Sequence, residues 1–308
     1  MRRWLLRLIP IIFYLLLAVF LVVYLTTIDF ARILTVRFDW PMLLIATVIG
    51  IAYRYWMVYI WLSILRSLGA GRFTDIPALC LVYAKSWLGR YIPGTAPWIL
   101  GKIFFAAQQG LSTSKLAVSS FLEGGLQVLV LLVSGLIMMA VDPRAALLDP
   151  TLTWAMVAVA VMGCIALWPR VFNAVARWVY RRIRHGELDA ADLPGWGTIG
   201  RGAGLYLAGS VLSGLSMFFV AKSVWPELPL TSLLFVIGAA NLASAASMVA
   251  IFAPSGIGVR EAILVILLSL VMPTEIAFVV SIVLRLWSIA ADLLFFGAAR
   301  THVALRHR

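Results

Sequence analysis

Nine charged side chains lie within long apolar stretches of this sequence. Charge is costly inside a membrane, so an intramembrane charged residue usually has a function. Six of the nine are basic and three are acidic, and pairing among them would leave three positive charges. An anion such as a lipid phosphate is the natural counter-charge. The residues are Arg54, Lys85, Arg90, Lys102, Glu123, Arg260, Glu261, Arg285 and Asp292.

Two breaks interrupt the apolar sequence close to these charges. Residues 253–261 read Ala-Pro-Ser-Gly-Ile-Gly-Val-Arg-Glu, and residues 89–97 read Gly-Arg-Tyr-Ile-Pro-Gly-Thr-Ala-Pro. A helix cannot continue cheaply here, because Pro lacks an N–H and Gly gives up backbone entropy. In hydrocarbon the freed backbone groups need partners, so we expect a site between the two breaks. The predicted break residues are Pro93, Gly94, Pro254, Ser255, Gly256 and Gly258.

The composition is that of a polytopic helical membrane protein. The 308 residues are 63% hydrophobic, and the mean hydropathy of +1.01 is far above that of a soluble domain. No polar block is large enough for an enzyme domain outside the bilayer, so we expect no enzyme activity, no cofactor and no metal site. The net charge of +12 fits basic loops between spans better than nucleic-acid binding. Cys80 and Cys164 have no metal or redox spacing.

The apolar runs define the elements that must position the charges. A crossing needs about 20 residues, which predicts six full spans, at 8–28, 41–66, 113–141, 152–169, 202–222 and 275–300. Two further pairs flank the breaks, at 77–92 with 95–110 and at 232–252 with 255–272. The first pair is too short to cross and predicts a re-entrant hairpin. Run 232–252 is long enough to cross, so whether it crosses or re-enters stays open.

The order of spans repeats, which predicts an all-α polytopic integral membrane protein with an inverted repeat. The single transmembrane domain, residues 1–308, divides into pseudo-repeats 1–149 and 150–308. Three crossings separate equivalent elements, so the two re-entrant hairpins enter from opposite leaflets. With six crossings most arginines fall on the face that carries both termini. We therefore expect both termini to be cytoplasmic, in the cell inner membrane.

The helix after each break carries one polar stripe. Glu123 and Arg285 each lie about ten residues into their helices, which is about 15 Å deep, at the midplane of the hydrocarbon core. We expect these two residues to lie close enough to pair in at least one state. The predicted substrate-binding residues are Arg260, Arg285, Glu123, Glu261, Arg54, Arg90, Lys102 and Asp292. The stripes are Ser120, Glu123, Gln127 and Ser134, and Ser281, Arg285, Ser288 and Asp292.

The aromatic residues have a simpler expected role. Tryptophan is enriched at membrane–water interfaces, where one end of its ring is apolar and the other is wet. This pattern predicts that Trp56, Trp61, Trp87 and Trp98 are interface anchors rather than part of the site.

Residues 252–261 with the later Arg285 resemble the pattern P-x-G-x-G-x-x-E…R of the lysylphosphatidylglycerol synthase transmembrane family. Residues 92–94, 101–102 and Glu123 are similar to the first-half motif of that family, although the loop here reads Pro-Gly-Thr-Ala-Pro. The resemblance implies a flippase-like membrane domain with re-entrant helices that moves a lipid between leaflets. The sequence carries no soluble aminoacyl-transferase domain, so we expect that it does not make lysyl-lipid itself.

The leading hypothesis is a lipid flippase or scramblase for an anionic phospholipid, an aminoacyl-phospholipid or a polyprenyl-phosphate-linked lipid. Without a nucleotide-binding motif, movement would be downhill or ion-coupled. One alternative is an intramembrane transferase that acts on a polyprenyl-phosphate lipid. Another is a non-transporting accessory subunit of a lipid synthase. Expected partners are membrane lipids, with a soluble lipid-modifying synthase or a glycosyltransferase and a homodimer as open alternatives.

Overall fold

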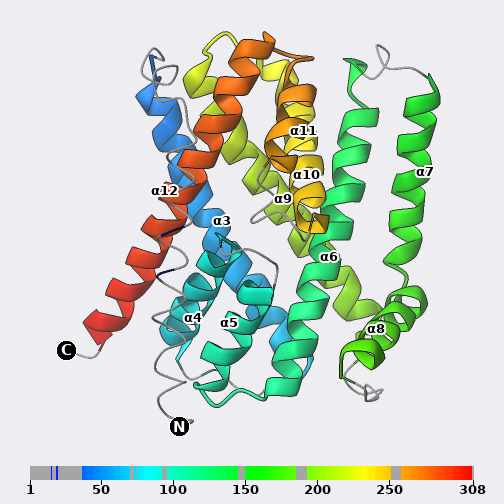
Figure 1. Cartoon of the computed structure of the whole chain (residues 1–308), viewed down its shortest axis with the longest axis vertical. Coiled ribbons are helices and arrows are strands. Elements are labelled where there is room, and N and C mark those ends of the chain that lie inside the picture. Colours follow the sequence, from blue (N-terminus) through cyan, green and yellow to red (C-terminus); the bar gives the residue numbers. More distant parts are fainter. Residues whose placement is uncertain are drawn as a thin grey trace.

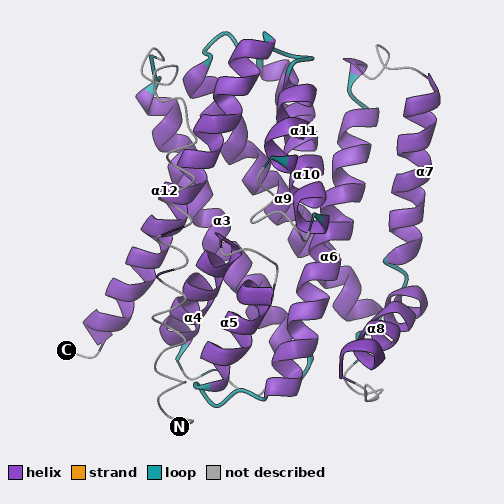
Figure 2. Ribbon diagram, viewed as in Figure 1, coloured by secondary structure: helices purple, strands orange, loops and turns teal. Residues whose placement is uncertain are grey.

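The computed structural model describes residues 15, 19, 37–69, 73, 75–91, 96–144, 150–184, 193–250 and 258–306. Within these ranges the chain is helical and has no strand, which confirms the all-α fold class (Figures 1 and 2). The elements are α3 (Trp40–Ser67), α4 (Ile76–Leu88), η1 (Gly89–Tyr91), α5 (Ala96–Ala107), α6 (Thr113–Ala140), α7 (Pro150–Ala166), α8 (Pro169–Arg184), α9 (Trp196–Val224), η4 (Leu230–Ser232), α10 (Leu233–Val249), α11 (Val259–Leu268) and α12 (Thr274–Arg306).

Five of the described helices are long and apolar enough to cross a membrane, and the bent pair α7–α8 is a sixth candidate. Four of the predicted spans are confirmed by α3, α6, α9 and α12. The fifth helix, Leu230–Val249, shows that the predicted run 232–252 reaches crossing length. The chain is therefore a multi-pass membrane protein. Of the predicted span 8–28 only residues 15 and 19 are described, and Pro93, Gly94, Pro254, Ser255 and Gly256 lie outside the described residues.

The starts of two helices follow from local sequence. Asp39 accepts a hydrogen bond from the backbone N–H of Met42, and Asp75 accepts one from the backbone N–H of Ala78. Each aspartate thus caps a helix whose first turn contains a proline, where the missing N–H has no intrahelical partner to lose.

The short helices form two pairs at opposite ends of the molecule. Figure 1 shows α4 and α5 in the lower half and α10 and α11 in the upper half. Within each pair the two helices pack against each other. The pairs also exchange partners between the halves of the chain, because α4 packs on α12 while α10 packs on α6.

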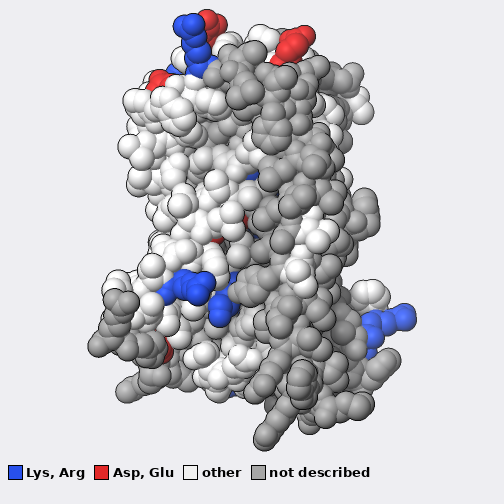
Figure 3. Space-filling model, turned by 60° about the vertical axis from the view of Figure 1, so that its left-hand side comes forward, with Lys and Arg blue, Asp and Glu red and all other residues white. Residues whose placement is uncertain are grey.

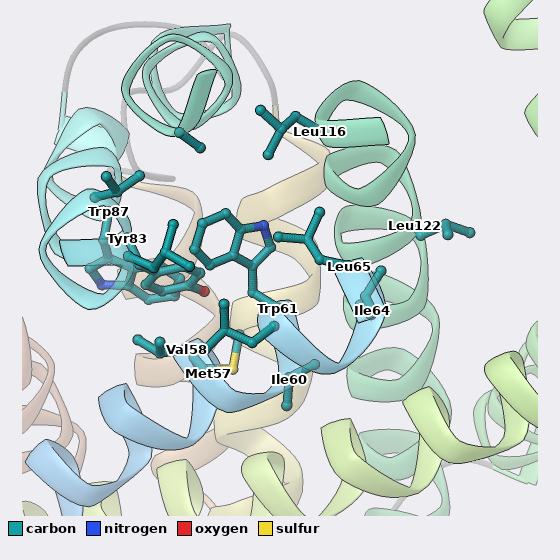
Figure 4. Close-up of a cluster of buried hydrophobic side chains, with 14 of the residues drawn as sticks. Met57, Val58, Ile60, Trp61, Ile64, Leu65, Tyr83, Trp87, Leu116 and Leu122 are labelled. Atoms are coloured by element: carbon teal, nitrogen blue, oxygen red, sulfur yellow. The ribbon is translucent and has the colours of Figure 1, made fainter. Parts of the chain in front are cut away.

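Helices α3 and α9 pack along each other at the centre of the bundle. The Ser216 hydroxyl donates to the carbonyl oxygen of Ala46, and the indole N–H of Trp56 donates to that of Leu205. A large apolar cluster fills the space between α3, α4 and α6. In Figure 4 the fully buried Trp61 lies at its centre, between Tyr83 of α4 and Leu116 of α6.

The arginine-rich segment after α7 is helical. It is helix α8, which bends by 78° from the axis of α7 at Pro169, a residue that has no N–H for the helix ladder. One face of α8 carries exposed apolar side chains, Val171, Val175 and Trp178. Exposed arginines occupy a neighbouring face. This pattern is typical of a helix that lies in the membrane–water interface.

Helices α6 and α10 approach each other closely at two glycines. A Cβ atom added at Gly135 would lie 3.0 Å from the carbonyl oxygen of Gly238 and 2.8 Å from Leu242. Backbone cannot move aside as a flexible side chain can. Small residues at such a contact let the backbones of membrane helices pack directly.

We expect Gly135→Ala to lower the free energy of unfolding by about 1–3 kcal/mol, because it overpacks this contact. Gly124 is the matched control, since it lies in the same helix and a Cβ there would meet nothing within 4 Å. Thermal unfolding of the purified protein in detergent measures both variants. Equal melting temperatures for Gly135→Ala and Gly124→Ala would contradict the close packing of α6 on α10.

Candidate functional site

A cavity of about 210 Å³ lies between the two halves of the chain. Four arginines line it, each from a different element, and the described lining contains no carboxylate. Helices α6 and α9 contribute polar side chains, Gln127, Ser213 and Ser216. The arginines are Arg54 of α3, Arg90 of η1, Arg260 of α11 and Arg285 of α12. The residues that flank both predicted breaks therefore reach the same cavity.

Asp292 of α12 lies behind this lining and joins three elements. Its Oδ1 accepts hydrogen bonds from Arg54 Nε at 2.7 Å and from the indole of Trp87 at 3.2 Å. Its Oδ2 accepts from Arg90 Nη2 and from the Tyr91 hydroxyl, both at 2.6 Å. The carboxylate is fully enclosed. One buried negative charge thus holds α3, α4 and η1 against α12.

Aromatic rings separate the arginines from one another. The Tyr91 ring lies 5.1 Å from the Arg90 guanidinium and 5.9 Å from that of Arg285. Trp87 also faces Arg90, at 4.7 Å. Each cation–π contact contributes about 0.5–2 kcal/mol, more where water is excluded. The rings therefore offset part of the repulsion between like charges on one cavity wall.

In this structure Glu123 and Arg285 have other partners, so the predicted pair is not formed in the state described here. The Glu123 carboxylate pairs with Lys102 of α5 and accepts a hydrogen bond from the Tyr83 hydroxyl at 3.0 Å. Both members of the ion pair are completely buried. Lys102 also faces the Trp98 ring at 4.3 Å. Equal depth in the membrane predicted that Glu123 pairs with Arg285. Lys102 lies on the neighbouring helix α5 and pairs with Glu123 instead.

The partner of Arg285 is Glu261, at 3.6 Å. The other carboxylate oxygen of Glu261 accepts from the backbone N–H of Gly258 at 2.8 Å, which caps the start of α11. Gly258 has a φ of +82°, a conformation that strongly favours glycine. Glu261 thus fixes the start of α11 and connects it to α12.

The two predicted polar stripes face the protein interior. All eight side chains are buried, none more than 8% exposed. In α6 the stripe also reaches α10, since Asn241 donates a hydrogen bond to the Ser134 hydroxyl. The helical spacing of the polar residues therefore predicted their orientation correctly, although not their partners.

The eight predicted site residues divide into two sets. The four arginines line the cavity, whereas the three carboxylates and Lys102 lie behind them as partners. Four guanidinium groups against the carboxylates of Asp292 and Glu261 leave two positive charges at the cavity. Lys85 accounts for the third charge that the sequence suggested, because it lies away from the cavity over the Phe105 ring.

Three of the four tryptophans predicted as interface anchors belong to the interior instead. Trp61 and Trp87 are buried, and Trp98 lines the cavity. A signal for this existed in the sequence, because Tyr83, Trp87 and Arg90 recur at steps of four and three on one helical face. The rings contact cations, which explains why they are not at the interface.

Comparison with known families gives one match. Residues 7–295 match the family described as Lysylphosphatidylglycerol synthase TM region. The match confirms the resemblance inferred from the two motifs and indicates a function connected with membrane lipids. No curated protein matches the chain.

Asp292→Asn is expected to lower the free energy of unfolding by about 3–5 kcal/mol, because it leaves the buried Arg54 and the partly buried Arg90 without their carboxylate. The control is Asp142→Asn, whose partner Arg144 is partly exposed. There we expect about 1 kcal/mol or less. Denaturant or thermal unfolding in detergent measures both changes, and equal losses would contradict the role of Asp292 as an anchor.

A double-mutant cycle tests the corrected partner of Glu123. Lys102→Met and Glu123→Gln should each cost about 3–5 kcal/mol of unfolding free energy, because each leaves one buried charge unpaired. The double variant should cost clearly less than the sum of the two.

The comparison cycle combines Glu123→Gln with Arg285→Met. Its costs should add to within about 0.5 kcal/mol, since these residues have different partners. If the double variant of the second cycle, and not that of the first, lost clearly less unfolding free energy than the sum of its single variants, the Glu123–Arg285 pair predicted from depth would be supported instead.

Proposed function

The chain belongs to the Lysylphosphatidylglycerol synthase TM region family, and we propose that it moves an anionic lipid between the leaflets of the membrane. The headgroup enters the cavity between the halves, while the acyl chains stay in the surrounding lipid. The proposed role is that of a flippase or scramblase and not of an enzyme.

One observation carries this proposal. The cavity has four arginines on its wall and two positive charges left after the partners are counted. Arginine offers several N–H donors in a planar fork that fits phosphate oxygens. A phosphate in the cavity would therefore supply the missing counter-charge, and its oxygens would accept hydrogen bonds from the arginines more strongly than neutral water does.

The arrangement of the short helices supports a path from both sides. The pairs α4–α5 and α10–α11 lie at opposite ends of the bundle (Figure 1), and residues next to their breaks line one cavity. We propose that α4–α5 is a re-entrant hairpin and that α10–α11, whose first helix reaches crossing length, is its counterpart in an inverted repeat. Alternate opening of the two halves then exposes the cavity to each leaflet in turn, as in transporters built from inverted repeats.

The distribution of basic residues supports an orientation. On the face drawn in Figure 3, the larger blue patches of the described residues lie below mid-height, whereas the upper end shows both blue and red. The end where α3 and α12 finish carries more Lys and Arg than the other end. We propose that this end is cytoplasmic, in the cell inner membrane. Its basic residues include Arg66, Lys115, Arg170, Arg177, Arg181, Arg182, Arg201 and Arg300, against Arg37, Arg144 and Lys222 at the other end.

No observation favours the alternatives over transport. A transferase that uses a metal ion would need clustered ligands, and the described residues contain no group of three or more His, Cys, Asp or Glu side chains that could hold one. An accessory subunit would not need a basic cavity between its two halves.

Transport is tested with the purified full chain in liposomes that contain fluorescent phosphatidylglycerol. A membrane-impermeant quencher reports how fast lipid moves from the inner to the outer leaflet. We expect Arg285→Ala to slow this movement about tenfold or more, the equivalent of one charge-assisted hydrogen bond to phosphate.

Arg201→Ala serves as the control, because Arg201 is an exposed arginine outside the cavity. It removes the same charge and should leave the rate unchanged. A wild-type rate equal to that of protein-free liposomes, or equal to that of Arg285→Ala, would remove the proposal.

A further inference from the structure

The four arginines of the cavity are not equally engaged with protein partners. Each of the three guanidinium nitrogens of Arg54 has a partner: Nε donates to Asp292, Nη1 to the carbonyl oxygen of Gly50 and Nη2 to that of Ser288. Arg90 uses Nη2 for Asp292 and Ser288, and its buried Nε has no hydrogen-bond partner within the described chain. Donor capacity therefore remains on one side of the cavity.

Arg260 stands out among them. It lines the cavity, and among the described residues it makes no hydrogen bond and no ion pair. Its strongest electrostatic neighbours are Arg285, Glu261 and Arg90. Two of these three are positive, and Glu261 is engaged with Arg285 and with the N-terminus of α11. A partly buried guanidinium in such surroundings has donors to offer and lacks a counter-ion.

The charge balance narrows what can fill the cavity. Two positive charges remain around it, and every carboxylate near the described lining is already paired with an arginine. The stretches 92–95 and 251–257, which lie outside the described residues and adjoin lining residues in the sequence, contain no charged residue. A phosphodiester with one charge would neutralise only half of the excess. An amino group on the headgroup would find no unengaged carboxylate among the described residues around the cavity.

We infer that this cavity selects a headgroup whose phosphate carries two negative charges, a phosphomonoester or a diphosphate, and that Arg260 is its main ligand. This inference rests on the proposed function and names the substrate class for it. A headgroup with a cationic amino group, such as an aminoacyl ester, is disfavoured by the same charges.

Binding is measured separately from transport, so that the two ideas can fail independently. The purified full chain in detergent micelles is titrated with dioleoyl phosphatidic acid, dioleoyl phosphatidylglycerol and lysylphosphatidylglycerol. We expect phosphatidic acid to bind about tenfold more tightly than phosphatidylglycerol, the equivalent of one additional charge-assisted contact. Lysylphosphatidylglycerol should bind more weakly than both.

The pH provides an internal check. A phosphomonoester loses its second proton near about pH 6, whereas arginine stays charged throughout. The preference for phosphatidic acid should therefore grow between about pH 5.5 and about pH 7.5. Phosphatidylglycerol stays a monoanion in this range. Any pH dependence of its affinity therefore reports a change in the titratable groups of the protein around the cavity. These groups are Glu261 of α11, Asp292 of α12, Tyr53 of α3 and Tyr91 of η1.

Substitutions at Arg260 test whether this residue causes the preference for phosphatidic acid. Arg260→Gln should bring the affinities for phosphatidic acid and phosphatidylglycerol close to each other, and Arg260→Lys should keep part of the difference. Arg201→Gln, the exposed control, should keep all of it. Melting temperatures of the same samples separate lost binding from lost folding, and Arg260→Lys remains informative if Arg260→Gln does not fold.

Three results would overturn the inference. They are equal affinity of the wild type for phosphatidic acid and phosphatidylglycerol, tightest binding of lysylphosphatidylglycerol, and an unchanged preference in a folded Arg260→Gln variant. Glycerol 3-phosphate distinguishes a lipid from a free phosphate: binding as tight as that of phosphatidic acid would overturn the assignment to a lipid. Selective binding without lipid movement in liposomes would leave the binding site standing and remove transport.

Discussion

A charge buried inside a membrane protein is stabilised by an opposite charge in the same interior, and α12 supplies one to each half of the molecule: the Asp292 carboxylate to the first half and the Arg285 guanidinium to the second. Asp292 binds Arg54 and Arg90, and Arg285, two turns earlier on the helix, binds Glu261. Without α12, Arg54, Arg90 and Glu261 would lose their partners of opposite charge in the low-dielectric interior. The positions of η1 and α11 therefore depend on a single helix face.

The same contacts connect structure to the proposed transport. Each pair of short helices is fixed to α12 by one carboxylate, Asp292 for the first pair and Glu261 for the second. The two carboxylates lie behind the cavity and the arginines face it. A phosphate that contacts these arginines would compete with the carboxylates for the same donors. Binding of a headgroup could thus weaken one tether at a time, which is the coupling that alternate opening requires.

Apolar and aromatic packing stabilises the helices that hold these buried charges. The cluster around Trp61 and Tyr83 excludes water from the Lys102–Glu123 pair, which strengthens their attraction and raises the cost of separating them. Close contact at Gly135 and Gly238 brings α10 against α6, so that the second half of the chain closes over the first. The buried charges are held by this packing as much as by one another.

The sequence by itself determined the helical fold class, most of the spans and the inward direction of the polar stripes. These follow from local chemistry: the length of apolar runs, prolines and aspartates at helix starts, and the spacing of Glu123 and Arg285 along their helices. Only the tertiary structure decided the partners. Glu123 pairs with Lys102 because α5 packs beside α6, and Trp87 reaches Asp292 because α4 packs on α12. Depth along a helix fixes only one coordinate of a side chain. A buried charge pairs with the nearest opposite charge on a neighbouring helix. Contacts between residues far apart in the chain decide which helices are neighbours.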